Sequence, residues 1–284
     1  MPEFPPVRLL GPADLKNLMA LSTDRGWLPE KRKWGLLLDT SEVFGVDAPD
    51  GKGLAGSVTL TRYGTLPDYG TAHASVGMML VAARYGRRGL GRALMTHLLG
   101  AAGDATVTLF ATAMGRPLYE KLGFRPTGRS VSFTGHFRPG PEEPAITTGP
   151  AAGSDLPAIV TLDKAVFGAD RSRILRRLPD FAEEIRVSED AAGYAAAWSN
   201  GQTTVIGPVI APDGATARRL ITDLAATARG PVRLELDPDR SELPAWAEAR
   251  GLTASSLNTV MAYGPWDPPG DRSRVFAPIT VALT

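Results

Sequence analysis

Residues 78–99 read MMLVAARYGRRGLGRALMTHLL, and this stretch decides the fold of the first half of the chain. An apolar run leads into a loop rich in glycine and arginine, after which Leu90, Leu94 and Leu98 recur at helical spacing. A strand, a glycine-rich loop and a helix start bring unpaired backbone N–H groups together at the positive end of the helix dipole. The stretch therefore predicts a cradle for an anion, with a phosphate or pyrophosphate as the expected guest.

The spacing of the glycines separates this loop from two other phosphate-binding motifs. A GxGxxG fingerprint would need glycine at Leu94, and a P-loop would need a lysine, which the loop lacks. The order present is GxxGxG, over Gly86, Gly89 and Gly91. It resembles motif A of the GNAT superfamily of acyl-CoA-dependent N-acyltransferases, whose loop amides hold the pyrophosphate of coenzyme A. Gly86 departs from the family pattern, which has Gln or Arg there, and the alternative is a glycine-rich turn before a surface helix.

A second motif lies at residues 108–124, TLFATAMGRPLYEKLGF, where a short strand precedes a helix that ends at Gly123. Glycine directly after Leu122 is a C-cap signal, because this position usually takes left-handed dihedral angles. The string LYEKLGF resembles the end of GNAT motif B, which implies that Tyr119 is the general acid that protonates the departing thiolate of coenzyme A. The alternative is that the Tyr119 ring is an ordinary core residue. The resemblance covers residues 7–137 and implies an α/β (α+β) fold, a mixed, mostly antiparallel sheet flanked by helices.

The resemblance also implies the remaining contacts of the site. The strand at 73–81 would present its main chain to the thioester and pantetheine arm, and one of its N–H groups would stabilise the oxyanion. Many relatives carry a glutamate on this strand as general base, whereas here His73 is its only titratable base. His73 is thus the candidate base, against the alternative of a surface or structurally satisfied histidine. The expected contacts with acetyl-CoA are Met79, Leu80, Val81, Gly86, Arg87, Arg88, Gly89, Gly91, Arg92 and Thr112.

The acceptor site is less clearly marked in the sequence. In the family, the segment after the first helix forms part of the acceptor pocket, here residues 22–34, STDRGWLPEKRKW. Asp24 or Glu30 is the candidate partner of an amine, and Trp27 and Trp34 are candidate stacking surfaces, against the alternatives of a solvated charge run and packed tryptophans. The resemblance implies acetyl-CoA as donor and a primary amine of a small molecule as acceptor. Acylation of a protein lysine or N-terminus, and a CoA-binding sensor without turnover, are the alternative functions.

Composition limits the class of protein and its partners. Of 284 residues, 43% are apolar and 21% charged, and the net charge of +1 gives no electrostatic reason to expect a nucleic-acid surface. Cysteine is absent and the three histidines lie far apart in the sequence, so no metal site is expected. No run approaches the ~18 apolar residues of a membrane helix, and the start lacks a signal-peptide pattern. We therefore expect a cytoplasmic protein without a membrane partner, its oligomeric state left open.

A proline-rich segment divides the chain into two halves that repeat the same order of motifs. Residues 138–144, RPGPEEP, hold three prolines and predict a linker. The segments PADLKNLMAL, RALMTHLL and YEKLGF of the first half are echoed by GSDLPAIVTL, RRLITDLA and AEARGL in the second. We therefore expect two GNAT-like domains, at residues 1–138 and 145–284, joined by a linker at 139–144.

The second copy lacks the features that mark the first copy as a site. Its loop, IAPDGATARRL, is shorter and keeps Gly214 alone, and Asp213 places a negative charge near the expected pyrophosphate position. Ala247 replaces Tyr119. A copy without an anion cradle or a proton donor should not transfer acyl groups from coenzyme A. We therefore expect an active N-terminal half and a degenerate C-terminal half that walls the acceptor pocket.

Overall fold

The first half folds as a mixed α/β unit. The computed structural model describes residues 4–65, 72–140, 146–239, 242–264 and 267–283. The strands of the first half are β1 (Arg8–Leu9), β2 (Glu42–Asp47), β3 (Leu54–Tyr63), β4 (His73–Val81), β5 (Thr106–Ala111) and β6 (Arg125–Gly135). Its helices are α1 (Leu15–Asp24), α2 (Lys31–Thr40), α3 (Leu90–Ala102) and α4 (Arg116–Lys121), with short 3₁₀ turns η1 (Pro12–Asp14) and η2 (Ala83–Tyr85).

The second half repeats this order. Its strands are β7 (Thr148–Pro150), β8 (Glu184–Ser188), β9 (Tyr194–Ser199), β10 (Thr204–Ile210), β11 (Val232–Leu236), β12 (Thr253–Tyr263) and β13 (Val275–Ala277). Its helices are α5 (Leu156–Phe167), α6 (Ser172–Leu175), α7 (Leu178–Phe181), α8 (Gly214–Thr227) and α9 (Leu243–Ala249), with 3₁₀ turns η3 (Gly153–Asp155) and η4 (Arg272–Arg274). The echoed sequence segments fall on matching elements, so that α5, α8 and α9 correspond to α1, α3 and α4.

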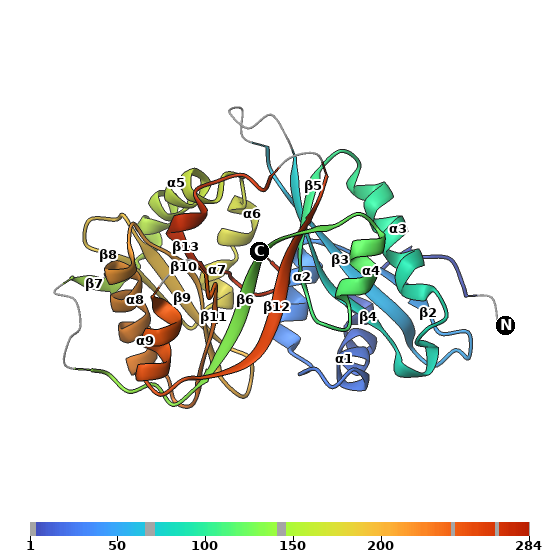
Figure 1. Ribbon diagram of the computed structural model, residues 1–284, viewed down its shortest axis with the longest axis horizontal. Coiled ribbons are helices and arrows are strands. Elements are labelled where there is room, and N and C mark those ends of the chain that lie inside the picture. The colour runs from blue at the N-terminus through green and yellow to red at the C-terminus, as the bar shows by residue number, and fades with distance from the viewer. Residues whose placement is uncertain (1–3, 66–71, 141–145, 240–241, 265–266, 284) are drawn as a thin grey trace.

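The strands of both halves join one 13-stranded sheet (Figure 1). Its path is β1-β2-β3-β4-β5-β12-β6-β11-β10-β9-β8-β7, and β13 pairs with β10 off this path. Among the described residues, only β4–β5 and β10–β11 pair in parallel, one pair in each half. The expectation of mixed, mostly antiparallel sheets flanked by helices is confirmed.

In each half, the strand that follows the last α-helix crosses to the other half. β12, which follows α9, lies between β5 and β6 and pairs antiparallel with both. β6, which follows α4, pairs on its other side with β11. The two strands run side by side through the centre of the molecule in Figure 1. The split at 1–138, 139–144 and 145–284 therefore remains a prediction about the repeated units, because in space the two halves share their central strands.

Helices fix the position of the glycine-rich loop against the sheet. α3 packs on β3 and β4 through the buried side chains of Leu90, Leu94 and Leu98. The approach is close, because a Cβ added to Gly56 of β3 would lie 2.9 Å from Leu94 Cδ1. The start of α3, and with it the loop, is therefore held against the end of β4. Within the described residues, no helix is long and apolar enough to cross a membrane.

The C-terminal segment reaches back onto the first half. A Cβ added to Gly77 of β4 would lie 2.8 Å from both the Cα and the carbonyl oxygen of Ala282. These are backbone atoms that cannot swing away, so glycine is needed at position 77. Ala282 and Leu283 are themselves buried. The end of the second half thus covers one face of β4.

The shared strands predict that neither half folds alone. Residues 1–138 without β12 would expose the edge of β5, and residues 146–284 without β6 would expose the edge of β11. Each fragment expressed alone should lack a cooperative thermal transition in circular dichroism, whereas the two co-expressed should elute together and regain it. A cooperative melt of fragment 1–138 alone, with the helical circular dichroism expected of the same residues in the full-length chain, would contradict the shared core.

Candidate active site

β4 and β5 separate part-way along their length. They pair in parallel from His73↔Thr106 to Val76↔Leu109, and among the described residues no pair follows. Beyond this point β4 stays paired with β3 and β5 with β12. Met78 has a left-handed φ of 47° at an irregularity of the β3–β4 register, which is a bulge that bends the strand. The main chain of residues 79–81, predicted to contact the thioester and pantetheine arm, therefore has no strand beside it on the β5 side.

The loop between β4 and α3 ends in an uncapped helix N-terminus. Gly89 is the N-cap of α3 with φ of 82°, and no side chain caps the helix. The first-turn N–H groups are therefore left for an outside acceptor. Arg87 also has a left-handed φ, of 61°, which is rare for a residue with a side chain. The loop is thus held in a specific shape in which an anion would meet converging N–H groups.

Arginines surround this N-terminus. Arg87, Arg88 and Arg92 are exposed, and in the described part of the chain no ion pair joins any of them to an acidic side chain. Arg84 differs, because its guanidinium donates to the carbonyl oxygen of Lys52 at 2.8 Å. Three guanidinium groups therefore remain to supply charge-assisted hydrogen bonds to a phosphate.

Gly91 lies where α3, β4 and α4 meet. An added Cβ at Gly91 would lie 3.1 Å from Met79 Cε and 3.3 Å from Leu118 Cδ2. Met79 belongs to the unpaired length of β4, and Leu118 belongs to α4. The absence of a side chain at Gly91 therefore keeps open the space beside the separating strands. Gly86 has an ordinary φ of −56°, but an added Cβ there would lie 3.3 Å from the carbonyl oxygen of Ala83.

Tyr119 lies on α4, and its side chain is buried. The ring packs edge-to-face on Phe124, with centroids 5.8 Å apart. It also borders the turn after β5, since a Cβ added to Gly115 would lie 3.0 Å from Tyr119 Cε2 and 3.5 Å from Thr112 Oγ1. No hydrogen bond joins the Tyr119 hydroxyl to another described residue. Burial raises the pKa of Tyr119 to about 12, so the phenol keeps its proton at neutral pH.

Other predicted contacts have structural partners of their own. Thr112 Oγ1 accepts a hydrogen bond from the Gly115 N–H at 3.2 Å, at the start of α4. Asp24 accepts from the Ala83 N–H at 2.6 Å and so holds the turn that leads into the glycine-rich loop. Its contact with an acceptor stays a prediction. Trp27 is exposed, so a stacking role for it also stays a prediction.

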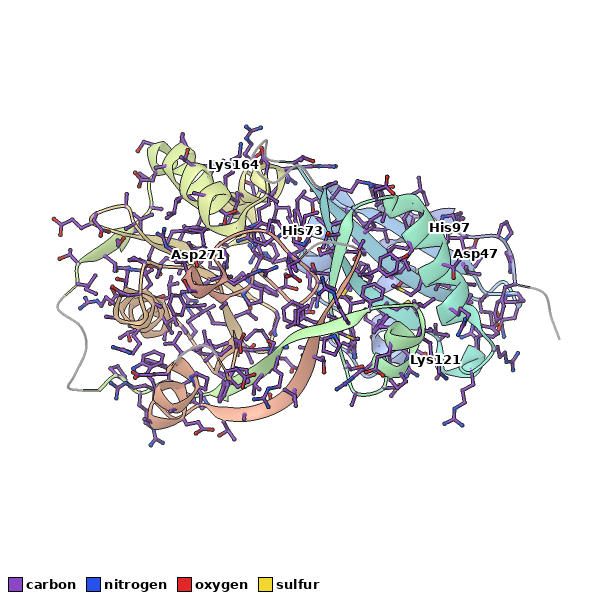
Figure 2. All side chains as sticks on the ribbon, turned by 45° about the horizontal axis from the view of Figure 1, so that its top comes forward. Asp47, His73, His97, Lys121, Lys164 and Asp271 are labelled. Carbon is purple, nitrogen blue, oxygen red and sulfur yellow. The ribbon has the colours of Figure 1, made fainter. Side chains whose placement is uncertain are left out.

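His73 lies in the core between the two halves. In Figure 2 it occupies the middle of the molecule, while His97 and Lys121 lie farther out on the first half. Its ring stacks on Phe167 of α5 with centroids 5.5 Å apart, and its Nε2 lies 3.0 Å from Thr108 Oγ1.

The burial of His73 sets its charge. Its Nδ1 is buried without a hydrogen-bond partner in the described part of the chain. Burial, with smaller contributions from the positive charges of Arg272 and Arg171, lowers its pKa to about 3. A sealed, weakly basic imidazole at the paired end of β4 is poorly placed to take a proton from an amine. The structure therefore argues against the predicted role of His73 as general base and gives it a packing role.

In the second half, the positions equivalent to the strand separation and to the uncapped helix start of the first half are both occupied by the chain itself. β10 and β11 also pair in parallel only briefly, at Thr204↔Val232 and Val205↔Arg233. Beyond this point β13 pairs with β10 and takes the place beside it. At the start of α8, the carboxylate of Asp213 accepts from the Thr216 N–H at 2.8 Å, so the helix is capped by its own chain. The repeats in the sequence located α8, but no local pattern showed that β13 would enter the gap.

In the residues that the structure describes, no group of three or more His, Cys, Asp or Glu side chains is placed to hold a metal ion.

Comparison with protein families matches both halves. The model described as "Acetyltransferase (GNAT) domain" matches residues 42–137, and a second model with the same description matches residues 159–277. Together the two matches cover well over half of the sequence. The chain belongs to the GNAT acetyltransferase family. The prediction of an N-acetyltransferase with tandem GNAT domains is confirmed at the level of the family.

Individual relatives agree with this GNAT assignment. The chain is 28% identical over 237 residues to the "Uncharacterized N-acetyltransferase YitH" of Bacillus subtilis, with 81% of each chain covered. A putative acetyltransferase from Pyrococcus horikoshii has a similar fold, with a TM-score of 0.82 at 18% identity over 98% of this chain and 95% of that one. A tandem GNAT protein from the clavulanic acid biosynthesis pathway gives a TM-score of 0.62 at 16% identity, over 93% and 100%. The two-copy arrangement is therefore shared with solved GNAT structures.

The buried His73 predicts a loss of stability in acid. The pKa of His73 is about 3 in the folded protein and about 6.5 in the unfolded chain. As pH falls below 6.5, the unfolded chain therefore binds a proton at His73 that the folded protein does not bind. The free energy of unfolding should then fall by about 1.4 kcal/mol per pH unit. Urea unfolding at several pH values should show a shallower dependence in His73→Phe than in the exposed-site control His97→Gln. Equal slopes in the two variants would contradict a neutral, buried His73.

Proposed function

We propose that the N-terminal half transfers an acetyl group from acetyl-CoA to a primary amine of a small molecule, directly, in a ternary complex. The observation that carries the proposal is the difference between two equivalent helix starts. Gly89 leaves the N-terminus of α3 uncapped, whereas Asp213 caps α8 with a carboxylate. An anion is therefore favoured at the first helix and repelled at the second. The donor would bind one half only.

The residues around α3 suit the parts of coenzyme A. The first-turn N–H groups and the guanidinium groups of Arg87, Arg88 and Arg92 would hold the pyrophosphate. The unpaired edge of β4 at residues 79–81 offers backbone groups to the amides of the pantetheine arm, as a neighbouring strand would. Gly91 leaves room for that arm between α3 and β4.

Transfer requires one proton to leave the amine and one to reach the sulfur. An alkyl ammonium has a pKa of about 10.4, so the acceptor must lose a proton to become nucleophilic. Its nitrogen then attacks the thioester carbon, a C–N bond forms, and the C–S bond breaks with the electron pair leaving on sulfur. The Tyr119 hydroxyl would donate a proton to this thiolate, and a main-chain N–H of residues 79–81 would stabilise the oxyanion. Solvent would receive the proton that the ammonium loses before attack, and the second proton, lost from nitrogen as the amide forms, would restore the Tyr119 hydroxyl.

The cover over β4 supports a small acceptor. Ala282 packs against Gly77 at the point where β4 and β5 separate, so the second half closes this face of the strand. A polypeptide acceptor would need an open groove across the same face. An amine-bearing small molecule needs only a pocket.

Release of thiol from acetyl-CoA over a library of small amines tests the function. A subset of amines should give saturable release, and lysine-containing peptides should give less. Binding of CoA without thiol release for any amine would instead support a sensor. Release with peptides alone would support a protein acceptor.

Gly91 predicts a selective loss of donor binding. In Gly91→Val the added methyl groups would enter the space beside Met79, and since Met79 and Leu118 approach with flexible side-chain ends, the fold should survive. CoA affinity in calorimetry should fall at least about tenfold, which is about 1.4 kcal/mol. The control is Gly100→Val, on the same helix with nothing within 4 Å of an added Cβ. Equal CoA affinity of the two folded variants would contradict the assignment.

Tyr119→Phe predicts a loss of turnover without a loss of donor binding. The substitution keeps the ring on Phe124 and removes only the proton, so kcat should fall by roughly 10²–10⁴-fold while CoA affinity stays unchanged. The matched control is Tyr263→Phe, from the same aromatic cluster, where the ring lies 5.3 Å from Phe124. Activity and melting temperature measured on one preparation decide the role. Full activity in Tyr119→Phe would remove this residue from the mechanism.

A further inference from the structure

A pocket of about 460 Å³ lies where the two halves meet. Four adjacent strands, β5, β12, β6 and β11, contribute to its lining, and residues of the segment 267–278 close it. This volume is typical of small-molecule sites. The pocket therefore combines strands of both halves with a cover from the second half.

One row of paired residues crosses the pocket from Phe110 of β5 to a carboxylate. Phe110 pairs with Val260, and Val260 pairs with Gly128. A Cβ added to Gly128 would lie 3.8 Å from Asp237 Oδ2, so the carboxylate of Asp237 lies over the bare backbone of Gly128. Phe110 directly follows Leu109, the last β5 residue paired with β4. The row thus starts where the strands separate and spans about 10 Å, two strand spacings, to the carboxylate.

The two ends of this row differ in chemistry. The start is apolar, with the side chains of Phe110 and Val260 in the lining. At the far end, Arg125 and Arg129 lie on either side of Gly128 on β6, opposite Asp237. At the rim, Arg125 forms an ion pair with Asp267, and Arg129 forms one with Asp239. Because a guanidinium has five N–H donors, an arginine in such an ion pair can still donate hydrogen bonds to a ligand. The far end therefore presents a negative group and positive groups side by side.

A buried hydroxyl also points to a ligand. Ser130 is 4% exposed and lines the pocket, and its Oγ has no hydrogen-bond partner in the described structure. A buried hydroxyl without a partner is unfavourable, and a polar ligand at this place would satisfy it. Ser130 lies two residues from Gly128 on β6, so the two positions share a face of the sheet at the charged end of the row.

We propose that this pocket is the acceptor subsite and that the acceptor is a diamino carboxylic acid. Its α-ammonium would lie on Asp237, its carboxylate on the side of Arg125, Arg129 and Ser130, and its methylene chain along Val260 and Phe110. The distal amine would reach the separation of β4 and β5. There its nitrogen replaces sulfur on the acetyl carbon, as in the proposed function on which this inference rests. The α-amine would stay unacetylated because Asp237 holds it away from the thioester.

The experiment compares acceptors that differ by one group. The probes are L-lysine and L-ornithine, 1,5-diaminopentane, which lacks the carboxylate, and Nα-acetyl-L-lysine, which lacks the α-ammonium. Thiol release from acetyl-CoA should give a kcat/KM for L-lysine or L-ornithine at least about tenfold above the other two, the loss expected for one charge-assisted hydrogen bond. An equal or higher kcat/KM for 1,5-diaminopentane would overturn the substrate class.

Two variants test the place of the subsite. Gly128→Leu would fill the pocket at a position where an added Cβ meets only ordinary contacts, and Asp237→Asn removes the charge and keeps the shape. Both should raise KM for L-lysine at least about tenfold with unchanged CoA affinity. The controls, Gly100→Leu and Asp104→Asn, lie exposed on α3 and directly beyond it. An unchanged KM in Gly128→Leu would overturn the assignment of the pocket.

Calorimetry separates this proposal from the proposed function. If no amine releases thiol, the transferase function fails, and L-lysine is titrated into the intact protein and into Gly128→Leu. Binding to the intact chain that is lost in the variant, with CoA affinity retained, would still support the pocket as a site for a diamino carboxylic acid. No binding to the intact chain, or equal binding to both, would overturn it.

Discussion

The backbone hydrogen bonds of β12 with β5 and of β6 with β11 are the interaction on which the rest of the structure depends. In each half, the strand after the last α-helix pairs with a strand of the other half, and these pairings join the strands of both halves into one sheet. β12 pairs with the edge of β5 that faces away from β4, along residues 107–111, so the edge toward β4 stays open where the two strands separate. A strand from the second half thus holds β5 in the sheet where it has left β4.

The two halves repeat one order of elements but differ at the equivalent of the candidate site. The segment from β13 to the C-terminal end accounts for much of this difference. β13 occupies the place beside β10 where the second half would otherwise have its own separated strands. A few residues later, Ala282 packs on Gly77 of β4. One segment therefore fills the gap of the second half and covers a face of the first. In the proposed function, this one piece of chain would both remove a donor site from the second half and enclose the site of the first.

Local patterns in the sequence were sufficient for the features that depend on neighbours in the chain. Glycine spacing located the loop at Gly86–Gly91 and the start of α3, and the C-cap at Gly123 located α4 with Tyr119. The sequence alone did not reveal pairings between distant segments, such as β12 with β5. His73 shows the reason: its pattern is that of a titratable residue on a strand, but burial lowers its pKa, with smaller contributions from Arg272 and Arg171 of the second half. Asp24 likewise accepts a hydrogen bond from the Ala83 N–H, and tertiary packing rather than sequence proximity brings these two residues together.

Division of labour between the halves follows from what each kind of recognition needs. A pyrophosphate can be held by backbone N–H groups at one helix start, so the donor site needs only the loop and α3 of the first half. An acceptor is distinguished by side-chain charge at a fixed distance from the reacting carbon, which needs groups on several strands. Strand exchange provides them, because it sets Gly128 of β6 beside β11, where Asp237 follows, in the same row as Phe110. A second half that bound coenzyme A would need the space beside β10 that β13 fills, and would lose the cover that encloses this row.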